Sequence, residues 1–178
     1  MSRDFEYILD IAAKFFKEKE IKKKFQIIQS SNITGWEIWL QIEFAYFLSG
    51  IDSPPEWYRE SSFEYDRRKE RIKLKLKPDF LIRKKGWKLD EYMALEFKQD
   101  VKPVSCLKKM LSDLDKYSKV RKSNNNLRSI WTLGIFYAED IDEVQDKFSK
   151  VLEEQGVYTL ENLTITQIDK TNYWFVLL

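Results

Sequence analysis

Two carboxylates and one lysine stand at a spacing that could assemble a site for a metal ion. Asp79 follows Pro78, and Glu96 and Lys98 flank Phe97 within an apolar segment. Side chains alternate between the two faces of a strand, so Glu96 and Lys98 share one face. Proline donates no ladder hydrogen bond, which marks Pro78 as a point where a strand opens beside Asp79. If the two segments form neighbouring strands, both carboxylates converge on one small volume.

Oxygen ligands of this kind suit Mg2+, which keeps several of its waters and is often held by one or two carboxylates. A bound Mg2+, or Mn2+ in its place, would polarise a phosphoryl oxygen and lower the pKa of a bound water. Lys98 would orient the attacking water or neutralise the charge that develops on the phosphate. The residue types therefore indicate hydrolysis of phosphodiester bonds.

The chain contains no histidine. This excludes Ser-His-Asp hydrolysis, Cys-His proteases, histidine-ligated zinc sites and nucleases with a histidine base. Catalysis in this chain would have to rely on carboxylates, lysine and a hard, oxygen-binding metal.

Several elements must position these residues. Apolar residues between 5 and 28 recur at helical spacing and predict one amphipathic helix or two short ones. Thr34 and Glu37 form a capping-box pattern that predicts a helix running to about Leu48. Alternation predicts two antiparallel strands at 71–82 and 92–98, after a weaker extended segment at 57–65. The remaining predictions are a helix at 103–119, a polar loop at 122–126, a buried strand at 129–137, a helix at 141–155 and a strand pair at 160–168 and 173–178.

This order of elements predicts an α/β fold with a mixed β-sheet flanked by α-helices. We expect one domain over residues 1–178. It would have an N-terminal helical part at 1–50, a catalytic α/β core at about 34–137, and a C-terminal helix and strands at 138–178.

The pattern resembles the PD-(D/E)XK phosphodiesterases, also called the restriction-endonuclease-like superfamily. The resemblance rests on Pro78-Asp79, a turn, Glu96-Phe97-Lys98 in an apolar strand and a following helix, and it spans roughly 34–137. It implies a restriction-endonuclease-like sheet, with Mg2+ bound by Asp79, Glu96 and the carbonyl of Phe97. It also implies that Lys98 serves the nucleophilic water.

Members of that superfamily often add a glutamate from the helix before the sheet, and this chain offers two. Glu37 has an alternative explanation as the second residue of the capping box. Glu43 shares a helical face with tryptophans and other apolar residues, where an unpaired carboxylate would be costly unless a metal or a lysine lay nearby. We therefore prefer Glu43 as the fourth catalytic and metal-binding residue, and keep Glu37 as the alternative.

The helix after the motif departs from the exonuclease-like members of the superfamily. Those members usually carry a glutamine and a tyrosine one helical turn apart, whereas this chain has Asp113 and Tyr117 at that spacing. The resemblance to the RecB-like subgroup is weakened accordingly.

A basic segment precedes the motif. Alternation places several cations on one strand face, at a spacing that roughly matches phosphates along a nucleic-acid strand. The alternative is a solvated edge strand whose lysines discourage aggregation. The residues predicted to bind nucleic acid are Arg71, Lys73, Lys75, Lys77, Lys84 and Lys85.

The composition indicates how the chain could attract nucleic acid and where in the cell it would lie. The formal net charge is only +2, so attraction to nucleic acid must come from local clustering. A single cysteine, together with an N-terminus that lacks signal-peptide features, predicts a cytoplasmic protein, and no apolar stretch predicts a membrane span.

These observations predict a Mg2+-dependent nuclease that cleaves DNA, in defence, restriction or repair. We expect a homodimer if both strands are cut, and a partner protein from a defence or repair system is a further expectation. The alternatives are a catalytically inactive nucleic-acid-binding or interaction module of the same fold, and a nuclease directed at RNA.

Overall fold

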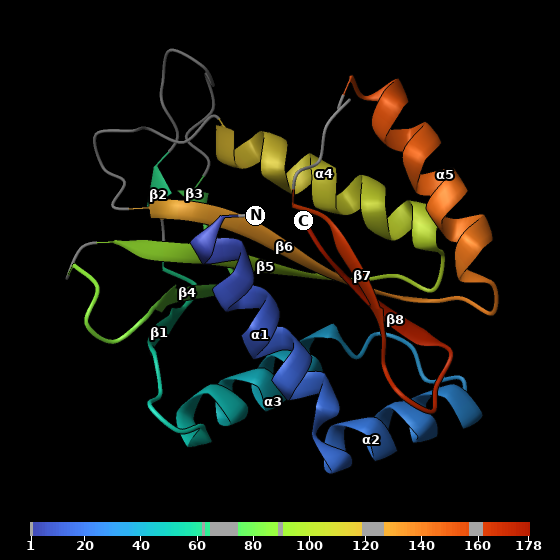
Figure 1. Ribbon diagram of the computed structural model, residues 1–178, viewed down its shortest axis with the longest axis horizontal. Coiled ribbons are helices and arrows are strands. Elements are labelled where there is room, and N and C mark those ends of the chain that lie inside the picture. The colour runs from blue at the N-terminus through green and yellow to red at the C-terminus, as the bar shows by residue number, and fades with distance from the viewer. Residues whose placement is uncertain (1, 62, 65–74, 89–90, 119–126, 157–161) are drawn as a thin grey trace.

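The computed structural model describes residues 2–61, 63–64, 75–88, 91–118, 127–156 and 162–178. Within these residues the chain forms five helices, a six-stranded mixed open sheet and a separate two-stranded sheet. Figure 1 shows three layers, with the large sheet between the helices that precede it in the chain and the helices that follow β5 and β6.

The first layer consists of α1 (Arg3–Lys17), α2 (Lys19–Ser30) and α3 (Glu37–Gly50). The backbone leaves helical geometry at Glu18, so of the two predicted alternatives, one helix or two short ones, the structure has two. The helices pack their apolar side chains against one sheet face, where Phe44 contacts both Phe80 and Phe97. This cluster forms the larger part of the core.

The large sheet has the order β1-β4-β5-β6-β8-β7. Only β5 and β6 run parallel, and every other neighbouring pair is antiparallel. Its strands are β1 (Glu56–Arg59), β4 (Phe80–Arg83), β5 (Tyr92–Gln99), β6 (Leu127–Tyr137), β7 (Thr164–Gln167) and β8 (Tyr173–Leu177). The predicted mixed sheet is confirmed, as are the antiparallel neighbours β4 and β5.

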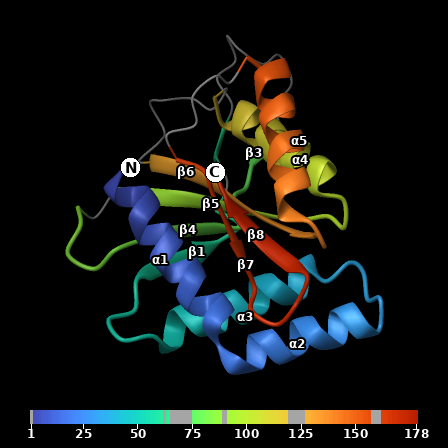
Figure 2. The same cartoon turned by 45° about the vertical axis from the view of Figure 1, so that its right-hand side comes forward.

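The second helical layer consists of α4 (Pro103–Ser118) and α5 (Ile141–Glu154), which lie together on the other sheet face (Figure 2). Gly134 of β6 allows α4 to approach closely. A Cβ at this position would lie 2.3 Å from Met110 Sδ and 2.9 Å from Cys106 Sγ. The missing side chain of Gly134 therefore sets how near α4 lies to the sheet.

The segment before Asp79 differs from its prediction. A continuous strand at 71–82 was expected, but β3 (Lys75–Leu76) pairs with β2 (Phe63–Glu64) in the small sheet, and β4 begins only at Phe80. The break falls beside Pro78, as its missing donor predicts. Residues 71–74 and the predicted loop at 122–126 lie outside the described residues.

Helix α3 begins later than predicted. Its N-cap is Trp36, and no side chain caps it, so the predicted capping box of Thr34 and Glu37 is wrong. No helix in the described parts of the chain is long and apolar enough to cross a membrane.

Candidate active site

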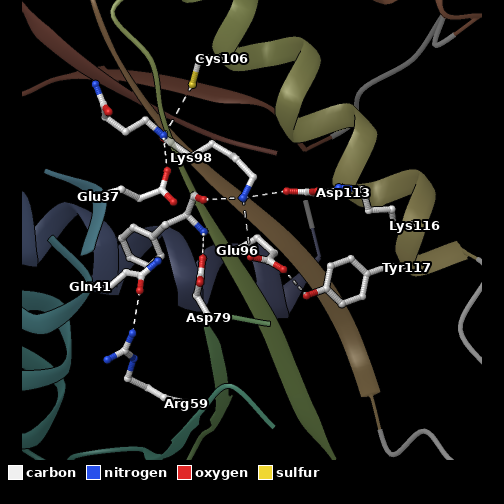
Figure 3. A network of polar contacts seen from close by, with 12 residues as sticks. Glu37, Gln41, Arg59, Asp79, Glu96, Lys98, Cys106, Asp113, Lys116 and Tyr117 are labelled. Carbon is white, nitrogen blue, oxygen red and sulfur yellow. Dashed lines mark hydrogen bonds and ion pairs between the residues drawn. The ribbon is translucent and has the colours of Figure 1, made fainter. Parts of the chain in front are cut away.

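Asp79 and Glu96 are brought together by the antiparallel pairing of β4 with β5. Asp79 immediately precedes β4, and Phe80 pairs with Leu95 across the two strands. The backbone N–H of Phe97 donates to Asp79 Oδ2 at 2.7 Å, which fixes the first carboxylate against β5 (Figure 3). The predicted convergence of the two carboxylates is therefore present in the fold.

Glu96 is buried, with 7% of its surface exposed. The Tyr117 hydroxyl donates to Glu96 Oε1 at 2.8 Å, so α4 holds this carboxylate from the face opposite the three N-terminal helices. Burial, followed by the charge of Asp79 and a hydrogen bond with it, raises the pKa of Glu96 to about 8. Two carboxylates thus crowd one water-poor position.

Lys98 lies next to this pair and has three oxygen neighbours. Its Nζ lies 2.8 Å from Asp113 Oδ2, 2.9 Å from the carbonyl oxygen of Phe97 and 3.9 Å from Glu96 Oε2. Burial opposes the charged form of Lys98, but the hydrogen bond to Asp113 and the charge of Glu96 raise its pKa overall. The side chain therefore carries an ammonium group at neutral pH.

Asp113 connects Lys98 to helix α4. Its second oxygen, Oδ1, lies 2.5 Å from Nζ of Lys116, one helical turn further along. Burial acts to raise the pKa of Asp113, but its hydrogen bonds to Lys116 and Lys98 lower it overall. Asp113 is therefore an ionised bridge between two lysines.

Glu37, the less favoured of the two helix glutamates, is the one that reaches the site. Its Oε2 accepts from the backbone N–H of Gln99 at 2.9 Å, directly after Lys98. Burial raises the pKa of Glu37, while the charge of Lys98 acts in the opposite direction. One turn later on α3, Gln41 is buried and its Oε1 accepts from Arg59 Nη2 at 2.7 Å.

Glu43 lies elsewhere, which corrects the preferred prediction. Its Oε1 accepts from Lys24 Nζ at 2.5 Å and from Trp39 Nε1 at 3.1 Å. The lysine that offsets the cost of this carboxylate therefore comes from α2, so no metal is needed to explain Glu43. Together with Lys14 and Lys84 it lines a cavity of about 970 Å3, which none of the motif residues lines.

The structure describes four of the six predicted nucleic-acid-binding residues, and these four are spread over different parts of the fold. Arg71 and Lys73 lie outside the described residues, and Lys75 belongs to the small sheet. Lys77 is exposed shortly before Asp79. Two further residues, Lys84 and Lys85, line the same cavity as Glu43.

The donors at the motif fit a hard cation that keeps several of its waters. Asp79, Glu96 and the carbonyl of Phe97 all offer oxygen ligands. A carbonyl oxygen has two lone pairs, so the carbonyl of Phe97 could accept a hydrogen bond from Lys98 and bind a cation at the same time. A cation would also relieve the crowding that raises the pKa of Glu96. Among the described residues, no group of three or more Asp, Glu, His or Cys side chains is arranged to hold a metal. Backbone oxygen and water would therefore have to complete the coordination.

Asp113 and Tyr117 contact the motif but were not predicted to be site residues. Asp113 and Tyr117 lie four residues apart, hence on one face of α4, and they contact Lys98 and Glu96 respectively. The signal available in the sequence was that α4 follows β5 directly and must pack back over it. Comparison with protein-family models, curated protein sequences and solved structures yields no match.

Proposed function

We propose that this chain is a Mg2+-dependent deoxyribonuclease with a restriction-endonuclease-like active site of the PD-(D/E)XK type. One observation carries the proposal: Asp79, Glu96 and Lys98 meet at the β4–β5 pair, in a buried setting that crowds two carboxylates beside one ammonium group. Crowding of this kind has a function at a cation site and little value in a purely structural core.

Each residue of the site has its own role in the proposed reaction. When bound, Mg2+ would supply a water of lowered pKa and polarise the phosphoryl oxygen. The N–H of Phe97 and the hydroxyl of Tyr117 orient the carboxylates of Asp79 and Glu96. Lys98 is protonated, so its role is to orient the attacking water and to neutralise charge on the phosphate, rather than to accept a proton.

Glu37 is positioned to support the same chemistry. Its carboxylate fixes the backbone after Lys98 and adds a negative charge near that lysine. We therefore assign to Glu37, in place of Glu43, the role of the helix glutamate.

A nucleic-acid-binding module of the same fold without turnover is the second candidate. It is favoured by the finding that the described residues contain no three-side-chain metal cage. An RNA substrate is compatible with either candidate, because a site that acts on phosphates carries no information about the sugar.

A homodimer is part of the proposal if both strands of a duplex are cut. Helix α3 exposes Ile38, Ile42 and Tyr46 by 68%, 55% and 81%, at positions one turn apart. This stripe is uncharged, so two copies could face each other across it without repulsion between like charges. Light scattering should then give twice the mass of one chain, and Ile42→Glu should return the mass to that of a single chain.

The experiment that tests the activity compares supercoiled plasmid, linear duplex, single-stranded DNA and RNA, each with Mg2+, Mn2+ or EDTA. The proposal expects cutting of DNA with either metal and none with EDTA. Retention of DNA without cutting under all conditions would favour the binding module. Cutting restricted to RNA would mean that the substrate is RNA and not DNA.

A further inference from the structure

A groove runs along α4 and opens onto Lys98. It has a volume of about 680 Å3, and its described lining residues all lie between 98 and 116, at the end of β5, in the turn after it and on α4. Its lining contains five lysines and one carboxylate, Asp113, which already contacts two of those lysines. The lysines are Lys98, Lys102, Lys108, Lys109 and Lys116.

This concentration of positive charge is local. The whole chain carries 31 basic and 29 acidic residues, so its overall charge is small. The larger cavity, between α1 and α3, mixes its lysines with Asp10, Glu18, Glu20, Glu43 and Asp52. That mixture does not suit a polyanion, whereas the α4 groove does.

The lysines also form a row. Lys109 and Lys116 lie seven residues apart on α4, and Lys102, seven residues earlier, directly precedes the first turn of the helix, so the three lie near one line. At 1.5 Å per residue the row is about 21 Å long, which corresponds to roughly six nucleotides of one strand. Lys102 and Lys108 have no acidic partner among the described residues, which leaves both ammonium groups available to phosphates.

The remaining lining shows which part of a nucleic acid the groove could contact. Besides the lysines and Asp113, the described lining consists of Val104, Ser105 and Ser112. No aromatic, amide or arginine side chain is among these described lining residues, which therefore offer little with which to stack on bases or read their edges. Lysines and hydroxyl groups are typical contacts to phosphate.

From these observations, and resting on the proposed function, we propose that the α4 groove binds the phosphate backbone of the substrate strand, without regard to base sequence, and leads it to Lys98. The path along α4 adds to the binding predicted for the basic segment before Asp79. Lys102 and Lys108 are its main contacts with the strand.

The test measures binding apart from cutting. Labelled single strands and duplexes of two unrelated sequences are titrated in EDTA at several salt concentrations, and fluorescence anisotropy reports the affinity. The variant is Lys102→Glu/Lys108→Glu, and the matched control is Lys17→Glu/Lys19→Glu, which makes the same charge change at two exposed lysines where α1 meets α2. Thermal unfolding of each variant verifies the fold.

The groove assignment expects the Lys102/Lys108 variant to bind at least tenfold more weakly for both sequences. It also expects a salt dependence shallower by roughly two phosphate contacts. The control should remain within about twofold of the wild type. Equal binding by the Lys102/Lys108 variant, a larger loss in the control, or full competition by millimolar inorganic phosphate would each overturn the assignment.

These outcomes separate the groove from the activity. If the wild type cuts DNA but the variant binds normally, the groove assignment fails and the nuclease stands. If the wild type binds through these lysines but cuts nothing with Mg2+ or Mn2+, the groove stands and the nuclease fails. A wild type that neither binds nor cuts overturns both.

Discussion

Lys98 has a defined protonation state because of the residues around it. Asp113 and the Phe97 carbonyl accept from its ammonium group at 2.8 and 2.9 Å, and together with Glu96 they keep the charged form favourable despite burial. Asp113 is therefore a positioning residue, since it acts through Lys98 and reaches the reacting atoms only by that route.

Asp113→Asn should lower kcat on the order of tenfold to a hundredfold with little change in KM, because Lys98 loses its orientation and not its place near the substrate. The pKa of Lys98 should also fall, which moves the alkaline limb of the rate profile to lower pH. Steady-state kinetics over a range of pH measures both effects. Glu143→Gln, which breaks the ion pair with Lys147 on α5, is the matched control and should change neither. An unchanged pH profile in Asp113→Asn would remove the positioning role.

Glu96 gives the metal-free protein a characteristic dependence on pH. Its pKa is raised from 4.5 to about 8 in the folded state, so the folded protein binds the proton more tightly than the unfolded chain does. The stabilisation linked to this proton is fully present below about pH 4.5 and is lost as pH rises towards 8.

The free energy of unfolding in EDTA should therefore fall between these two pH values more steeply in the wild type than in Glu96→Gln, by up to about 1.4 kcal/mol per pH unit. Denaturant unfolding at several pH values measures the difference. Parallel curves for the two proteins would show that the Glu96 carboxyl is not perturbed.

At the scale of elements, the site depends on how closely α4 packs on β6. Gly134 pairs with Lys98 across the two parallel strands, and its missing side chain admits Met110 and Cys106 of α4. The thiol of Cys106 also reaches the carbonyl oxygen of Lys98, at 3.8 Å. The same helix then carries Asp113 and Tyr117 to the motif.

Gly134→Ala should destabilise the protein by about 1–3 kcal/mol, because its Cβ would overlap the sulfur atoms of α4. Urea unfolding measures the loss. Gly50→Ala is the control, since a Cβ there meets nothing within 4 Å and should change stability much less. Equal stability of Gly134→Ala and wild type would mean that α4 is not held as closely as described.

The helices and strands also show which parts of the site could be predicted from the sequence. The period of two in β5 and the strand break at Pro78 are local properties, and the structure has Asp79, Glu96 and Lys98 side by side at the β4–β5 pair, as these two signals predict. The choice between Glu37 and Glu43 depended on tertiary packing. Lys24, which pairs with Glu43, is 19 residues away on α2, and the backbone N–H that binds Glu37 belongs to β5. Neither contact leaves a periodic signal in the sequence.

At the scale of the whole molecule, charge and shape separate two faces. The cavity between α1 and α3 carries mixed charges, while the groove along α4 is rich in lysine and leads to the motif. In the part of the chain that the structure describes, the proposed path for a polyanion therefore lies along α4 and reaches Lys98, although the overall charge of the chain is nearly zero.

The most direct test of the central claim compares plasmid cleavage with Mg2+ by the wild type, Asp79→Asn, Lys98→Met and Glu43→Gln. Asp79→Asn keeps an acceptor for the N–H of Phe97, and Glu43→Gln alters a partly buried, ion-paired glutamate outside the site. We expect the first two variants to lose at least about a hundredfold in rate with their folds intact, and Glu43→Gln to stay within about threefold of the wild type. Full activity in Asp79→Asn or Lys98→Met, or no metal-dependent cleavage by the wild type, would contradict the account.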